Sequence, residues 1–163
     1  MARFSKSTTE KALMIVQDER SSGTAGGSFS SGAWRTRTLN TVKTNDIDGA
    51  SLSSNRITLP KGKYHVKAKC PSFFAGESKA SFYNVTDGTI DIYSQNGGSI
   101  YTSGTTNAGN AQTFLEGTIE ISDSKVFEVQ HRSTLTRSSD GFGRATSFGV
   151  NEVYTNVTIE KIG

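Results

Sequence analysis

Residues 55–70, NRITLPKGKYHVKAKC, decide the fold class, because two runs of alternating polarity flank a short turn segment. Alternation with a period of two residues is typical of a strand with one face on a core and the other in water. Between the runs lies Pro60-Lys61-Gly62-Lys63, where proline and glycine favour a turn. We therefore expect a β-hairpin here. Its second strand should point these side chains inward: Tyr64, Val66, Ala68 and Cys70.

The composition favours many short strands. Ser, Thr, Gly and Asn account for 68 of the 163 residues, whereas Leu, Ile, Val and Phe account for only 34. The first group suits strands and turns and leaves little helix-forming material. An apolar fraction this small gives a thin core, so we expect the chain to complete its burial against copies of itself.

Several function classes are disfavoured by residue counts. The 18 basic residues are scattered, and no Lys/Arg-rich run indicates a nucleic-acid surface. The apolar run at residues 12–16 is too short for a signal-peptide core or a membrane span, so we expect no membrane insertion. With one Cys and two His, at positions 70, 65 and 131, we expect no metal site, no cofactor and no catalytic residues, and hence no enzyme.

Further strands are expected along the rest of the chain. Residues 79–86 and 89–93 flank Asp87-Gly88, which is a strong hairpin signal. Residues 13–19, with apolar side chains on both faces, indicate a central strand. Further extended segments are expected at residues 33–40, 112–122, 125–133 and 152–162. We expect residues 1–11 to form a short N-terminal arm and residues 12–163 a single domain.

The lengths of the connections divide the domain into two ends. If successive strands run antiparallel, the short joins lie at one end and the long ones at the other. We call the end with the long joins the crown and the opposite end the base. Binding surfaces concentrate on loops held by a rigid scaffold, so the crown is the expected recognition surface. The joins are residues 60–63, 86–88 and 122–124 at the base, and 71–78, 94–111 and 134–151 at the crown.

An ordered set of motifs resembles the C1q/TNF-like jelly-roll modules found in bacteriophage tail-fibre and other virion-surface proteins. The resemblance covers roughly residues 12–162. It implies an all-β, ten-stranded jelly-roll sandwich that assembles as a compact homotrimer, with its termini at the base and its loops at the apex. The motifs that carry it are WRTRTLN at 34–40, LSSNRITLPKGKY at 52–64, FEVQH at 127–131, GFG at 141–143 and EVYTNV at 152–157.

Aromatic side chains in the crown loops are the candidate binding residues, because exposed rings can stack on sugars or anchor a partner. The loop at residues 140–144 is the first choice, because its two glycines let the backbone turn sharply and present Phe142 between an acid and a base. The alternative is that this loop packs on a neighbouring subunit. We expect Trp34 to fill the core or a subunit interface. The candidate receptor-binding residues are Phe73, Phe74, Tyr101, Asp140, Phe142 and Arg144.

The resemblance implies a bacteriophage protein located in the virion. We expect a trimeric knob that binds a host surface glycan or protein through its crown. With only about a dozen residues before the first strand, we expect another virion protein to dock the base. Two alternatives remain: a head-decoration protein that stabilises the capsid without receptor binding, and a soluble C1q/TNF-like ligand.

Overall fold

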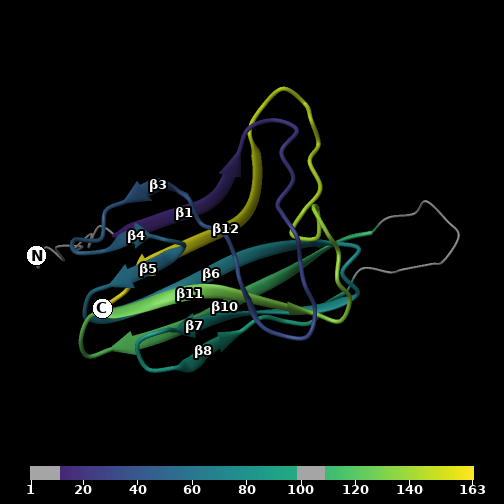
Figure 1. Ribbon diagram of the computed structural model, residues 1–163. Helices are drawn as coiled ribbons and strands as arrows, with labels where there is room; N and C mark the ends of the chain where they lie inside the picture. Colours follow the sequence, from purple (N-terminus) through teal and green to yellow (C-terminus); the bar gives the residue numbers. More distant parts are fainter. Residues whose placement is uncertain (1–11, 99–108) are drawn as a thin grey trace, which may run out of the picture.

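The chain folds into two stacked antiparallel sheets, as the composition and the resemblance predicted (Figure 1). The computed structural model describes residues 12–98 and 109–163, and every regular element in these ranges is a strand. In the same ranges, no helix is long and apolar enough to cross a membrane. Ten of the described strands form the main paths of the two sheets and two shorter strands pair at their sides, which makes the fold a jelly-roll sandwich.

The first sheet has five strands, and its middle strand is β12. The expected central position of the first strand is confirmed, because it lies between two neighbours. In spatial order the strands are β10 (Asn110–Ile121), β6 (Gly62–Phe73), β12 (Glu152–Lys161), β1 (Leu13–Arg20) and β3 (Thr41–Asn45).

The second sheet contains the hairpin predicted at Asp87-Gly88. Its two strands pair, and Gly88 has a φ of 73°, which a glycine adopts without strain. The extended segment expected at residues 33–40 is only two residues long in the structure. In order the strands are β4 (Ser51–Ser53), β5 (Arg56–Leu59), β11 (Lys125–Ser133), β7 (Glu77–Asn84) and β8 (Thr89–Tyr93), with β2 (Arg35–Thr36) on β11 and β9 (Gly97–Gly98) on β7.

The hairpin predicted for residues 55–70 is wrong. β5 pairs with β4 and β11, whereas β6 pairs with β10 and β12, so the two strands belong to opposite sheets. The turn at residues 60–63 carries the chain across the sandwich. Gly62 is needed there for a close approach, since a Cβ would lie 2.9 Å from Lys161 Cε and 3.1 Å from the Gly163 carbonyl oxygen.

The expected orientation of the β6 side chains is confirmed. The apolar positions are buried and face the second sheet, while the basic residues between them point outward. On the inner face of the second sheet, Phe82 of β7 and Phe127 of β11 stack with ring centroids 4.7 Å apart. Cys70 lies fully inside the core, and burial raises the pKa of its thiol to about 11. The thin core predicted from composition is therefore one continuous layer between the sheets.

Both described ends of the domain lie at the base, on the left in Figure 1. Lys63 N donates to the Gly163 carbonyl at 2.8 Å, and Lys161 N donates to the Ala12 carbonyl at 2.9 Å. The described residues of the long joins lie at the opposite end, which confirms the predicted division into base and crown for this part of the chain. Residues 99–108 of the join 94–111 lie outside the described residues. One join was overestimated, because β6 extends to Phe73 and β7 begins at Glu77, leaving only residues 74–76 between them.

Candidate functional site

In the described part of the chain, two loops at the crown end hold each other in place. Residues 21–34 and 134–151 run side by side at the top right of Figure 1. Phe29 and Arg137 exchange backbone hydrogen bonds of 2.9 Å in both directions, Phe142 N donates to the Gly27 carbonyl at 3.0 Å, and Gly26 N donates to the Gly143 carbonyl at 2.9 Å. Reciprocal backbone bonds of this kind give the loops the order of a small sheet. The crown is therefore a structured platform.

Phe142 lies inside this platform, and the prediction of an exposed ring at this position is wrong. It is 8% exposed and packs on Phe29, with ring centroids 4.6 Å apart. The neighbouring glycines allow the close packing: a Cβ on Gly141 would lie 2.6 Å from that of Phe29, and a Cβ on Gly143 would collide with the Tyr154 ring. The Gly-Phe-Gly motif is thus a packing motif within one chain.

Arg37 is the buried cation at the centre of the crown. Its guanidinium donates hydrogen bonds to the carbonyl oxygens of Pro71 at 3.1 Å and Phe142 at 3.0 Å, and to Thr155 Oγ1 at 2.7 Å. Burial lowers its pKa to about 10, so the side chain remains charged at neutral pH. One charged fork therefore ties β6, β12 and the crown loop together.

The other candidate residues are also engaged within the chain. Phe73 is only 2% exposed and packs edge to face on half-buried Phe74, so an exposed ring at position 73 is also wrong. Asp140 accepts a 2.7 Å hydrogen bond from Arg137. Exposed Arg144 lies over the Phe73 ring, 5.3 Å from its centroid. Tyr101 lies outside the described residues.

His131 is not placed to act on an external substrate. Its ring is fully buried against Phe29, and its Nε2 is 3.4 Å from Thr113 Oγ1. Burial and the nearby charge of Arg37 hold its pKa well below the usual 6.5. Within residues 12–98 and 109–163, no group of three His, Cys, Asp or Glu side chains is arranged to hold a metal ion.

Beyond the packed centre of the crown, one loop tip presents apolar side chains to solvent. Phe148 is 81% exposed and Val150 is 67% exposed. The tip is held by Glu152, whose carboxylate accepts hydrogen bonds from the backbone N–H groups of Ser147 at 2.8 Å and Gly23 at 3.1 Å, and also from Thr146. These donors lower the pKa of Glu152 to about 2.

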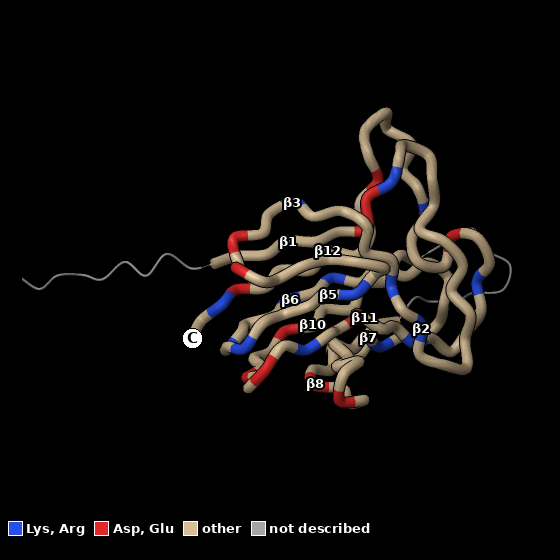
Figure 2. Tube along the Cα trace, turned by 60° about the vertical axis from the view of Figure 1, so that its left-hand side comes forward, with Lys and Arg blue, Asp and Glu red and all other residues tan. Residues whose placement is uncertain are grey.

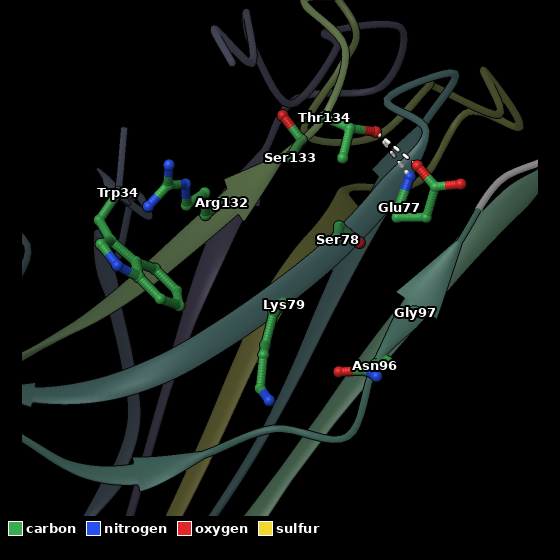
Figure 3. A pocket seen from close by; sticks show the side chains of 9 residues that line it. All are labelled: Trp34, Glu77, Ser78, Lys79, Asn96, Gly97, Arg132, Ser133 and Thr134. Carbon is green, nitrogen blue, oxygen red and sulfur yellow. Dashed lines mark hydrogen bonds between the residues drawn. The ribbon is translucent and has the colours of Figure 1, made fainter. Parts of the chain in front are cut away.

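A pocket of about 400 Å³ opens at the crown end of the outer face of the second sheet (Figure 3). Trp34 and Arg132 form one side, Lys79 lies on the floor strand, and Glu77 and Asn96 form the other side. The volume falls within the 300–1,000 Å³ that is usual for small-ligand sites.

Four segments bring the pocket together. β2 pairs with β11 so that Arg35 faces His131, which places Trp34 beside the next residue of β11. On the other flank, β9 pairs with β7 through Gly97, where a Cβ would lie 2.7 Å from a Thr113 methyl group. Trp34 is half-buried at this pocket and is not part of the core cluster, so the expectation of a core residue is wrong, and the alternative of a subunit interface stays a prediction. The only sequence signal for this role was a lone Trp next to a Gly/Ser-rich stretch.

Comparison with known proteins identifies the fold. No family model matches the chain, and no curated protein matches it in sequence. Among solved structures, the chain is similar to the globular domain of zebrafish complement 1qA protein, with a TM-score of 0.57 and 11% sequence identity. The match covers 94% of this chain and 98% of the other. The fold is therefore a jelly roll of the C1q/TNF-like type.

Proposed function

We propose that this chain is a bacteriophage virion-surface protein, a trimeric knob that is docked through its base and binds a host surface glycan through its crown. The observation that carries the proposal is the structured crown opposite the base, where Ala12 and Gly163 lie. A knob attached at that end holds its loops away from the particle. The phage setting rests on the motif resemblance described above.

The trimer is supported by the outer face of the first sheet. Leu13 and Ile15 alternate with the buried side chains of β1 and so point outward. Phe114 on β10 and Val153 on β12 are 43% and 48% exposed. In the described part of the chain, the second sheet covers only the inner face, which leaves these apolar side chains available to other copies of the chain.

The charge distribution agrees with a protein partner or glycan more than with a polyanionic duplex. Lys and Arg residues are interspersed with Asp and Glu around the sandwich (Figure 2). The outer face of β6 shows this pattern: His65 Nε2 and Lys67 Nζ lie 3.0 and 3.6 Å from Glu116 Oε1 on β10. A nucleic-acid surface would need basic residues gathered on one face.

Particle imaging tests the location. Gold-labelled antibodies against this chain should decorate intact phage particles. Separately, a Lys61→Gln change at the base should leave expression of the free protein unaffected. Absence of the chain from purified particles would contradict the virion role. Decoration of the head together with no binding of the purified chain to host cells would instead favour the head-decoration alternative.

Sedimentation equilibrium tests the assembly. The free protein should sediment at three times the 17.5 kDa of the chain. Phe114→Lys should dissociate it, whereas Leu135→Lys, at an equally exposed crown position, should not. A monomer at micromolar concentration would refute the trimer.

A further inference from the structure

We propose that the pocket beside Trp34 binds a carboxylate-bearing sugar residue, such as a uronic acid unit of a surface polysaccharide. This inference rests on the proposed function, since it names the class of glycan that the crown would recognise. It is carried by two features of the pocket: two cations that form no ion pair within the described residues, Arg132 on one side and Lys79 on the floor strand, and the aromatic ring of Trp34 beside Arg132 (Figure 3).

The cation pair is formed by Arg132 and Lys79. These residues lie directly opposite each other on the antiparallel strands β11 and β7, and both side chains point to the outer face. Like charges directly opposite on neighbouring strands destabilise a sheet. Among the described residues neither side chain forms an ion pair; Lys79 Nζ instead lies over the Tyr93 ring, 5.5 Å from its centroid. In Figure 3 the two charged ends extend away from each other, and an anion bound beside Arg132 would reduce the repulsion that remains.

The guanidinium of Arg132 suits a carboxylate in particular. A planar carboxylate can accept two parallel N–H bonds from an arginine fork, and such paired, charge-assisted bonds are among the strongest in proteins. Arg132 is solvent-exposed at the pocket and makes no hydrogen bond that would hold its fork elsewhere within the described residues. Lys79 adds a second positive charge from the neighbouring strand.

The aromatic wall suits a sugar ring. The face of an indole carries negative charge density, and the C–H bonds on one face of a pyranose are weakly positive, so the two stack. Trp34 lies beside Arg132, as the register of β2 on β11 requires. A ring stacked on Trp34 can therefore direct a carboxylate toward Arg132.

The remaining lining groups can hold sugar hydroxyls. The Glu77 carboxylate is fixed on the far side of the pocket, because Thr134 Oγ1 donates to its Oε2 at 2.7 Å. Glu77 can still accept hydrogen bonds from a ligand, and the amide of exposed Asn96 can both donate and accept them. A bare phosphate or sulfate would use the two cations but none of these groups.

The test is a titration followed by the fluorescence of Trp34, the single Trp of the chain. Glucuronate oligosaccharides should change the emission saturably. Neutral glucose oligosaccharides of equal length should bind at least about tenfold more weakly, as expected for the loss of one charge-assisted pair. Arg132→Gln should weaken glucuronate binding by a similar factor and weaken its dependence on salt. Lys61→Gln, which removes one charge at the base, should change neither.

Stability measurements separate binding from a structural role. Arg132→Gln removes the repulsion with Lys79, so its Tm should be unchanged or higher while its affinity falls. Equal affinity for the charged and neutral sugars, a lowered Tm with lost binding, or inorganic phosphate binding as tightly as glucuronate would overturn the inference. Host-cell binding that survives in Arg132→Gln would also overturn it while leaving the proposed crown function intact.

Discussion

The guanidinium of Arg37 lies 4.1 Å from the centroid of the Phe142 ring and donates a 3.0 Å hydrogen bond to the carbonyl oxygen of the same residue. Residues 105 positions apart are thus joined through both a ring and a backbone group. This contact joins the crown loop to the sandwich, so the presentation of the crown depends on a residue that never reaches the surface.

Replacing Arg37 with Ala should destabilise the whole domain. Pro71 and Phe142 would each lose a donor to a carbonyl, Thr155 would lose one to its hydroxyl, and a large cavity would remain. Buried acceptors without partners cost about 1–3 kcal/mol each, so a loss of roughly 3 kcal/mol or more is expected in urea unfolding. Arg35→Ala, at an exposed neighbouring position, should cost less than about 1 kcal/mol. Equal urea midpoints for the two variants would contradict this account.

Stability should fall as the pH drops from 7.5 to 5.5 because of His131. Its pKa is lower in the folded chain than the usual 6.5 of the unfolded chain, so the unfolded chain binds more protons below about that pH. The free energy of unfolding should then decrease by up to about 1.4 kcal/mol per pH unit.

His131→Phe provides the control for the pH effect. The buried Nδ1 has no hydrogen-bond partner among the described residues, so an apolar ring can replace the imidazole. The variant should keep its stability at pH 7.5 and lose most of the pH dependence. If the free energy of unfolding of this variant depended on pH as steeply as that of the wild type, the pH effect would come from groups other than His131.

Glu152→Gln should loosen the crown tip. A carboxylate accepts from Ser147, Thr146 and Gly23 at once, and the neutral amide is a weaker acceptor. Hydrogen exchange at residues 146–149 should become faster, whereas Glu120→Gln on β10 should leave it unchanged. Since the pKa of Glu152 is lowered from 4.5 to about 2, its contribution is present above pH 4.5 and is lost as the pH falls toward 2. Unchanged exchange in Glu152→Gln would refute the anchoring role.

Replacement of the two crown phenylalanines, Phe142 and Phe148, should change stability by very different amounts. Phe142 is 8% exposed and Phe148 is 81% exposed. Phe142→Ala should cost about 3–5 kcal/mol because it removes a buried ring, and Phe148→Ala should cost less than about 0.5 kcal/mol. Thermal unfolding of both variants measures the difference. Similar Tm values would show that the crown loop does not pack as described.

The sequence predicted most of the longer strands and their inward faces, because alternation is a local property of each segment. It did not predict the short strands β3 and β4, and it overestimated the length of β2. It did not predict that β5 and β6 lie in opposite sheets, since a turn with Pro60 and Gly62 serves both arrangements. β5 pairs with β11 and β6 pairs with β12. These partner strands are far away in the sequence, so the local pattern of residues 55–70 carries no information about them.

The candidate site was harder to predict for the same reason. The Gly, Asp and Arg neighbours of Phe142 predicted an exposed ring, but Phe29, more than a hundred residues earlier, buries it. The pocket combines Trp34, Lys79 and Arg132 from three segments, and only the sheet register brings them together. These three residues are each more than forty positions apart in the sequence, so no local pattern relates them.

Binding of the purified, fluorescently labelled protein to host cells tests the central claim most directly. The wild type and Lys61→Gln should bind intact cells saturably and lose binding when the acidic surface polysaccharide is removed enzymatically. Arg132→Gln, with an unchanged Tm, should bind about tenfold more weakly. Wild-type protein that binds stripped and intact cells equally, or binds neither, would contradict recognition of a host glycan by the crown.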